Sequence, residues 1–247
     1  MFVIPCKYSP VHNYIVPLVQ QIRKWHPTEP IVVVDSDSDD KSYMAALAEY
    51  DVRIEDVANH YWMVGAYWHA FKKWPDEPFY YFLHDSMIVK GNMDYLKDNE
   101  LTVFACFERN VLQEFGCMSK PIEEHTCFRW TKNGYGCAGP IFFCQNQVMR
   151  FLREHGCDRV LPTNKLETGG CEAAFGLFFE GLGYKIGPDD GHNLHGNILF
   201  EESPKGRSGP PPHDTSWQYP IEKFYASHRG KAGDGRNKNA GFDFSGH

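Results

Sequence analysis

The stretch Ile31–Asp40, with the sequence IVVVDSDSDD, decides the fold that this chain is expected to adopt. Its first part, Ile31–Val34, contains only β-branched residues, which is typical of a strand that is buried on both faces of a parallel sheet. The aspartates and serines that follow favour turns and helix N-caps, so the strand is expected to end near Asp35. In an open α/β sheet, ligands bind beyond such strand ends. The stretch therefore predicts an α/β fold with a site close to Asp35.

Strand and helix signals alternate on both sides of this stretch. Before it, Phe2–Cys6 is a short apolar strand, and Tyr14–Trp25 has apolar residues at helical spacing, with Asn13 as a fitting N-cap. After it, the same reasoning predicts helices at 42–50, 61–74, 147–154 and 172–180, and strands at 52–54, 79–83, 101–107, 139–143 and 184–186. This alternation predicts a mostly parallel central sheet that is flanked by helices and joined by right-handed crossovers.

The domain organisation follows from length and local composition. A chain of 247 residues accommodates one large domain with an appendage. The sequence changes character after about Glu202, since residues 203–214 are rich in Pro and Gly, and residues 230–247 are rich in Gly, Asn and Asp. We therefore expect one domain over residues 1–202, and a flexible loop and C-terminal tail over residues 203–247.

Composition and charge exclude several classes of protein. Hydrophobic residues make up 42% of the chain and charged residues 23%, which predicts a globular protein and not a disordered or fibrous one. A net charge of −7 disfavours nucleic-acid binding. No apolar run approaches the roughly 20 residues that span a bilayer, and the first residues do not resemble a secretory signal. The 8 cysteines include no CxxC pair, which favours reduced thiols and a cytoplasmic location.

Two predicted strand ends carry carboxylates that could act on a ligand. Asp35 begins the acidic turn, and Asp85 follows the strand predicted at 79–83. Each acid taken alone is explained by a solvated turn or a helix N-cap, whereas the two at one sheet edge favour a binding site. A calcium loop that starts at Asp35 is disfavoured, because its sixth and twelfth positions hold Asp40 and Ala46 instead of Gly and Glu.

The order of these elements resembles the nucleotide-sugar glycosyltransferases of the GT-A fold, a Rossmann-like α/β fold, and most closely the inverting family 2. Four segments carry the resemblance over about residues 2–187: Phe2–Cys6, Ile31–Ser38, Phe79–Met87, and Gly139–Phe143 with Glu172–Tyr184. They resemble in turn the first strand, the second strand with its acidic turn, the strand that ends in the metal-binding Asp-x-Asp motif, and the acceptor-side strand with the helix of the catalytic acid. The resemblance implies a nucleotide-binding half over about residues 1–100 and an acceptor half over about residues 101–202.

The resemblance also implies a donor site and a divalent cation, Mn²⁺ or Mg²⁺. The donor-binding residues that it implies are Pro5, Lys7, Asp35, Asp37, His84, Asp85, Arg229 and Lys231. The implied metal ligands are Asp85 and His228. The chain departs from the family motif, because the segment His84–Met87 offers a single carboxylate, that of Asp85. One carboxylate can hold such a cation when the donor phosphates and water complete its shell.

For the catalytic base, the resemblance points to Glu172. Inverting transfer needs a base that takes the proton from the acceptor hydroxyl. Counting back from the pair Gly183-Tyr184, the family's base position falls on Glu172, at the expected start of a helix, and Glu167 is the reserve candidate. A glutamate at a helix N-terminus also complements the helix dipole, so a purely structural role is the alternative.

The resemblance therefore predicts a hexosyltransferase-type enzyme. It would move a sugar from a nucleotide-diphosphate donor, implied to be UDP-linked, to a hydroxyl of a glycan, a glycoprotein or another acceptor. One alternative is a sugar-1-phosphate nucleotidylyltransferase, which shares the fold but has a Gly-rich, basic loop that Lys7–His12 lacks. The other is a non-catalytic module that binds sugars or nucleotides. The aromatic helix 61–74 is expected to be mostly core, with Trp62, Tyr67 and Trp68 as candidates for stacking on a base or sugar.

Overall fold

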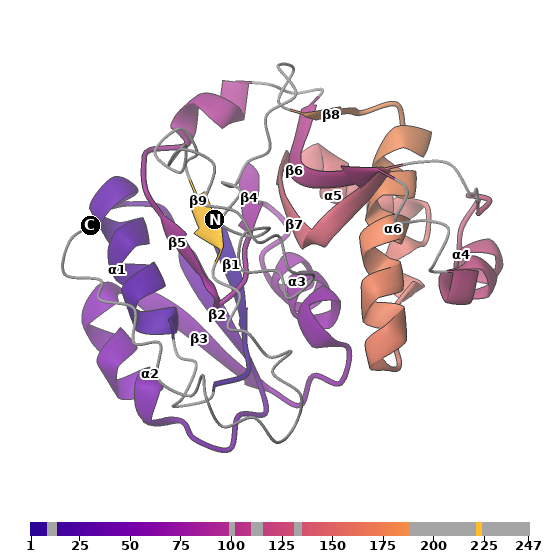
Figure 1. Cartoon of the computed structure of the whole chain (residues 1–247). Helices are drawn as coiled ribbons and strands as arrows, with labels where there is room; N and C mark the ends of the chain where they lie inside the picture. The colour runs from indigo at the N-terminus through magenta and orange to yellow at the C-terminus, as the bar shows by residue number, and fades with distance from the viewer. Residues whose placement is uncertain (9–13, 99–101, 110–115, 131–134, 188–220, 224–247) are drawn as a thin grey trace, which may run out of the picture.

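The computed structural model describes residues 1–8, 14–98, 102–109, 116–130, 135–187 and 221–223, which form a layered α/β structure (Figure 1). The strands of its central sheet are β1 (Phe2–Cys6), β2 (Ile31–Ser36), β3 (Val52–Val57), β4 (Phe79–Phe82), β6 (Thr102–Arg109), β7 (Tyr135–Gln145) and β8 (Lys185–Gly187). Their order across the sheet is β3-β2-β1-β4-β7-β6-β8. A second, two-stranded sheet pairs β5 (Met87–Val89) with β9 (Ile221–Lys223).

The sheet is mostly parallel, as the alternation of elements predicts. The pairs β1–β2, β1–β4, β2–β3 and β6–β8 are parallel, and β7 runs antiparallel to both β4 and β6. In the β1–β2 ladder, Cys6 pairs with Asp35 at the last step. The carboxyl ends of these two strands therefore lie level at one edge of the sheet.

Helices cover both faces of the sheet. One face carries α1 (Ile15–Trp25), α2 (Ser42–Leu47) and the small sheet, and the other carries α3 (Trp62–Lys73), α5 (Asn146–Glu154) and α6 (Lys165–Gly181), with α4 (Ser119–His125) beyond α6 (Figure 1). Short 3₁₀ turns occupy Ala48–Tyr50, Asp94–Asp98, Gly116–Met118 and Cys157–Arg159. Each face has its own buried apolar cluster, so the molecule is a three-layer arrangement with a core on either side of the sheet.

The β-branched run of β2 shows why the sheet must be covered twice. Val32 and Val34 pack into the cluster under α3, whereas Ile31 and Val33 pack into the cluster under α1. Because alternate side chains of a strand point to opposite faces, an all-apolar strand is stable only between two layers. The strand predicted from Ile31–Val34 is confirmed, and it extends to Ser36.

Aromatic rings join the two halves of the sheet beneath α3 and α6. The centroid of Phe82 in β4 lies 4.7 Å from that of Phe142 in β7, and Phe142 lies 4.9 Å from Phe175 in α6. Tyr67 of α3 lies 4.6 Å from Phe82 and is fully buried, and its neighbour Trp68 is buried too. Tyr67 and Trp68 are therefore core residues, and among the three stacking candidates only Trp62 is exposed.

The structure corrects the predicted start of the last long helix. The sequence predicts a helix from Glu172, but α6 begins at Lys165 and runs through the Gly169-Gly170 pair. A side chain at Gly170 would place its Cβ 2.3 Å from Cγ of Met118. The glycine here thus allows close packing and does not break the helix, which explains the error.

Other differences are smaller. The helix predicted at 42–50 ends as a 3₁₀ turn, and β7 extends four residues before and two after the predicted strand. The sequence did not predict β5, α4 or β9. Ile221 of β9 lies within the expected flexible tail, yet it is fully buried. Apart from 221–223, the expected tail lies outside the described residues, as does the predicted N-cap Asn13.

In the part of the chain that the structure describes, no helix is long and apolar enough to cross a bilayer.

Replacing Asn164 with Ala should lower the free energy of unfolding by about 1 kcal/mol. The side chain of Asn164 is the N-cap of α6 and accepts a hydrogen bond from the backbone N–H of Glu167 at 3.0 Å. Asn164→Asp keeps the acceptor and should be close to wild type. Urea denaturation of the three proteins tests this, and an equal loss in both variants would show that the cap is not the cause.

Candidate functional site

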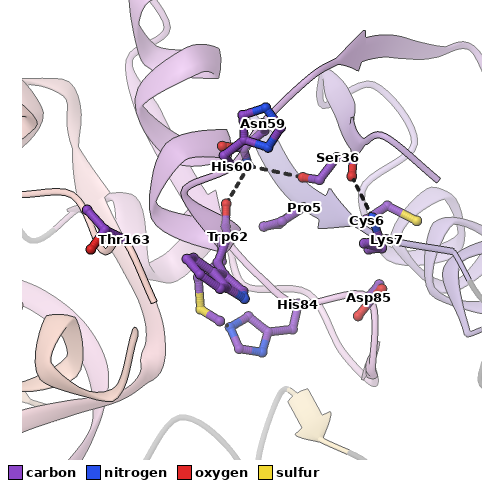
Figure 2. A pocket seen from close by; sticks show the side chains of 11 residues that line it. Pro5, Cys6, Lys7, Ser36, Asn59, His60, Trp62, His84, Asp85 and Thr163 are labelled. Carbon is purple, nitrogen blue, oxygen red and sulfur yellow. Dashed lines mark hydrogen bonds between the residues drawn. The ribbon is translucent and has the colours of Figure 1, made fainter. Parts of the chain in front are cut away.

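A cavity of about 610 Å³ opens at the carboxyl edge of the sheet (Figure 2). Its walls come from the ends of β1 and β2, from the segments that follow β3 and β4, and from the residue before the N-cap of α6. The lining residues are Pro5, Cys6, Lys7, Ser36, Asn59, His60, Trp62, Met63, His84, Asp85 and Thr163. This is the edge at which open α/β sheets bind ligands, and the volume is in the usual range for a small-molecule site.

The cavity brings together four of the residues predicted to bind a donor. Pro5 and Lys7 come from the end of β1, and His84 and Asp85 follow β4. They meet because β1 pairs in parallel with β4, so that both strands end at the same edge. The sequence did not single out Ser36, Asn59, His60 or Thr163. The only signal for Asn59 and His60 was their position after a strand.

Lys7 ties the loop after β1 to the turn after β2. Its Nζ donates hydrogen bonds to the backbone carbonyl of Ser36 at 3.4 Å and to that of Asp37 at 3.1 Å. The backbone N–H of Tyr8 donates to Oγ of Ser38 at 2.7 Å. These contacts hold a cationic group at the wall of the cavity. Asp37 takes part through its carbonyl oxygen, and its exposed side chain does not line this cavity.

Asp35 has an internal role in this structure. Its carboxylate is fully buried; Oδ1 accepts from the backbone N–H of Ser38 at 2.8 Å, and Oδ2 accepts from the hydroxyl of Tyr43 at 2.5 Å. Burial, with the neighbouring Cys6 and Asp35, raises the pKa of Tyr43 above its ordinary value of 10.0, so the phenol stays a neutral donor. Asp35 does not line the cavity. Its direct contact with a donor stays a prediction, and the geometry matches the alternative of a turn-forming acid.

His84 and Asp85 present the polar groups of the loop after β4. Nε2 of His84 lies 2.9 Å from Sδ of Met63, and both side chains are half-buried. Burial is the main cause that raises the pKa of the neighbouring Cys6 thiol, and the charge of Asp85 adds to it. Cys6 therefore stays protonated and is no nucleophile.

The structure tests the predicted metal set only in part. In residues 1–187 and 221–223, gaps excepted, no group of three or more His, Cys, Asp or Glu side chains is placed to hold a metal ion. Asp85 lies in the cavity, while His228 falls outside the described residues, as do Arg229 and Lys231. Among the described residues that line the cavity, Asp85 supplies the one carboxylate, and a cation there would need ligands from a bound molecule.

The two candidate bases occupy different positions on α6. Glu167 lies in its first turn, where Oε2 accepts from the backbone N–H of Thr163 at 2.7 Å and from its hydroxyl at 2.8 Å. These hydrogen bonds lower the pKa of Glu167 below its ordinary value of 4.5, and the one from the backbone of Thr163 has the largest effect. Glu172 is in the helix interior, half-buried, and does not line the cavity. The prediction that Glu172 lies at the start of a helix is thus wrong; the glutamate in the first turn of α6 is Glu167.

Replacing Asp35 with Ala should lower the free energy of unfolding by about 2–6 kcal/mol, because two buried donors lose their acceptor at about 1–3 kcal/mol each. Tyr43→Phe removes one of these donors and leaves only Oδ2 of Asp35 without its partner, so it should cost less, about 1–3 kcal/mol. Asp35→Asn, which keeps an acceptor oxygen, is the matched control. Chemical denaturation followed by circular dichroism checks the ranking, and a stable Asp35→Ala protein would contradict it.

Comparison with known proteins finds matches among solved structures. No model of a protein family matches the chain, and no curated protein does. Among solved structures, the chain is similar to the galactosyltransferase LgtC in complex with donor and acceptor sugar analogues, with 12% identity over 92% of this chain and 87% of that one, and a TM-score of 0.49. It is also similar to an active-site mutant of LgtC, with 12% identity over 90% and 86% and a TM-score of 0.48. At this level the likeness carries no functional conclusion, and the narrower resemblance to family 2 finds no support in it.

Proposed function

We propose that this protein is a glycosyltransferase that moves a sugar from a nucleotide-diphosphate sugar, with uridine as the nucleoside, to a hydroxyl acceptor. The observation that carries the proposal is one cavity at the carboxyl edge of the sheet, with the ammonium of Lys7, the carboxylate of Asp85 and the exposed indole of Trp62 in its walls. A cation, a hard metal ligand and an apolar ring are the groups that a charged, sugar-bearing donor requires. The choice of uridine rests on the family resemblance.

Lys7 is the residue that would hold the diphosphate. Its ammonium has three donors, of which two point to the carbonyls of Ser36 and Asp37. The ammonium is therefore fixed in place by neutral groups and keeps its charge for an anion. As the sugar leaves, negative charge grows on the diphosphate, and a fixed cation stabilises that charge without having to reorganise.

Asp85 would hold a divalent cation together with the donor. Mg²⁺ and similar ions are often held by one or two carboxylates, the phosphates of the substrate and several waters, and a cavity with one carboxylate fits this pattern. A bound Mn²⁺ or Mg²⁺ supplies Lewis-acid stabilisation of the leaving diphosphate. Because the described residues that line the cavity include one carboxylate, that of Asp85, the metal and the nucleotide should bind cooperatively.

Asp85→Asn should weaken the binding of UDP by tenfold or more when Mn²⁺ is present, on the scale of a lost charged contact, and should change it little in EDTA. Isothermal titration calorimetry of wild type and variant with UDP, with and without Mn²⁺, measures this. Glu49→Gln, which neutralises an exposed carboxylate outside the cavity, is the matched control. Equal UDP affinity in the two proteins under both conditions would remove Asp85 from the site.

Release of UDP from UDP-glucose and UDP-galactose tests the enzyme itself. Steady turnover with Mn²⁺ supports a transferase, while tight binding without turnover, in the presence of a panel of glycan acceptors, would show a non-catalytic module. Formation of a nucleoside triphosphate from UDP-sugar and pyrophosphate would instead identify a nucleotidylyltransferase.

We propose an inverting reaction with a glutamate of α6 as the base. Glu172→Gln should lower the transfer rate by about a hundredfold or more and leave donor affinity unchanged, since the amide keeps the shape and loses the basicity. Glu167→Gln is measured beside it, because Glu167 contacts the cavity residue Thr163. If only Glu167→Gln is inactive, the base is Glu167. If both variants are active and the product keeps the donor's anomeric configuration, inversion is wrong.

A further inference from the structure

Trp62 is held in a backbone conformation that a bulky residue rarely adopts. It is the first residue of α3, and its φ is +48°. Among non-glycine residues this left-handed region is sparsely populated, and positions of this kind persist only where surrounding contacts enforce them. Such strained positions cluster at functional sites, so the contacts that hold Trp62 are informative.

A single amide, that of Asn59, enforces this conformation. Nδ2 of Asn59 donates to the backbone carbonyl of Trp62 at 2.5 Å and to Oγ of Ser36 at 3.0 Å. Oδ1 of Asn59 accepts from the backbone N–H of Tyr61 at 3.0 Å. The amide thus ties the start of α3 to the end of β2 (Figure 2). The backbone at Trp62 is thereby fixed relative to the sheet edge that carries the cavity.

The first turns of α3 are shaped to admit this amide. A Cβ at Gly65 would lie 2.2 Å from Oδ1 of Asn59 and 2.8 Å from Cβ of Tyr61. Any larger residue at position 65 would displace Asn59 from the contacts that hold Trp62. We call the hydrogen bonds of the Asn59 amide to Ser36, Tyr61 and Trp62 the Asn59 clamp. Gly65 leaves room for this clamp and does not itself line the cavity.

The clamp keeps an apolar ring open to solvent inside a polar cavity. Trp62 is 38% exposed, whereas Tyr67 and Trp68 of the same helix are buried in the core. In the view of Figure 2 the indole lies on the His84 side of the cavity and Lys7 on the other. The same cavity is lined by His60, His84 and Thr163; the imidazoles have ring nitrogens that form hydrogen bonds, and the Thr163 hydroxyl, which donates to Glu167, can still accept one.

We propose that the indole of Trp62 is a binding platform for a pyranose ring, positioned by Asn59. A pyranose has an apolar C–H face and a rim of hydroxyls. The face matches the electron-rich face of an indole, and the hydroxyls match the imidazoles and the threonine around it. With a diphosphate at Lys7, the sugar lies on the side of the cavity that Thr163 closes and the nucleobase lies away from it. The platform rests on the proposed function only for the origin of the sugar, which is either the donor or the acceptor.

Labelling the six tryptophans with 5-fluorotryptophan gives a direct test by ¹⁹F NMR. The resonance that disappears in Trp62→Phe belongs to Trp62. We expect it to shift with UDP-glucose, UDP-galactose or methyl glycosides of glucose, galactose, mannose and N-acetylglucosamine, and to stay in place with UDP alone. A shift with nucleotide sugars alone assigns the donor sugar, and a shift with methyl glycosides assigns the acceptor sugar. A shift of equal size with UDP, or no shift with any of these ligands, overturns the platform.

Affinity measurements separate the contribution of the Trp62 indole to sugar binding from that of the Asn59 clamp. Trp62→Ala should weaken binding of the sugar ligand that shifts the resonance by about tenfold and leave UDP affinity unchanged, with Trp62→Phe in between. Asn59→Asp and Gly65→Ala keep the indole but disturb its hold, so they should weaken sugar binding to a smaller extent. Tyr95→Ala, which removes an exposed ring outside the cavity, should bind as wild type. Wild-type sugar affinity in Trp62→Ala overturns the proposal.

The two proposals fail in different ways. If wild type binds neither UDP nor nucleotide sugars while methyl glycosides still move the Trp62 resonance, the transferase proposal fails and the platform stands. If UDP-sugars turn over in Trp62→Ala as in wild type, and neither UDP-sugars nor methyl glycosides lose affinity in this variant, the platform fails and the transferase stands.

Discussion

The buried carboxylate of Asp35 is the contact on which the cavity depends. By accepting from Ser38 and Tyr43 it fixes the turn that follows β2, and that turn holds both walls of the cavity. Its carbonyls at 36 and 37 anchor the ammonium of Lys7, and its Ser36 hydroxyl receives the amide that clamps Trp62. An acid that does not line the cavity can thus position two groups that do, the ammonium of Lys7 and the indole of Trp62.

Burial keeps two acidic groups of this edge neutral. The pKa values of Cys6 and Tyr43 rise because both side chains are taken out of water, and each stays neutral as a result. Lys7 is exposed and Asp85 is half-buried, and these two side chains bring an ammonium and a carboxylate to the described wall of the cavity. The opposed charges suit a ligand that carries phosphates and a metal ion at the same time.

The local sequence predicted the strands and helices in which the pattern of buried side chains repeats regularly along the element. The β-branched run at 31–34 and the apolar faces of α1 and α3 carry their burial pattern in each residue, so strand and helix could be read directly. The start of α6 could not, because Gly170 breaks helices in isolation and is tolerated here only for its packing on Met118. The cavity edge, with Pro5, Lys7, His84 and Asp85, was predicted. The Asn59 clamp was not, because its partners at 36, 61 and 62 are joined by folding and not by any spacing in the sequence.

The strand β9 also affects the order in which the protein can mature on the ribosome. Ile221 packs with β5, whose first residue follows Asp85 by two positions. The buried apolar cluster that contains Met87, Val89 and Ile221 is therefore incomplete until a segment far downstream of β5 has been synthesised and has left the exit tunnel. A nascent chain can form the β1–β2–β4 layer before β9 exists, but β5 gains the pairing partner that the structure describes only when β9 arrives. Completion of this core is thereby linked to the synthesis of β9 and not to that of β5 alone.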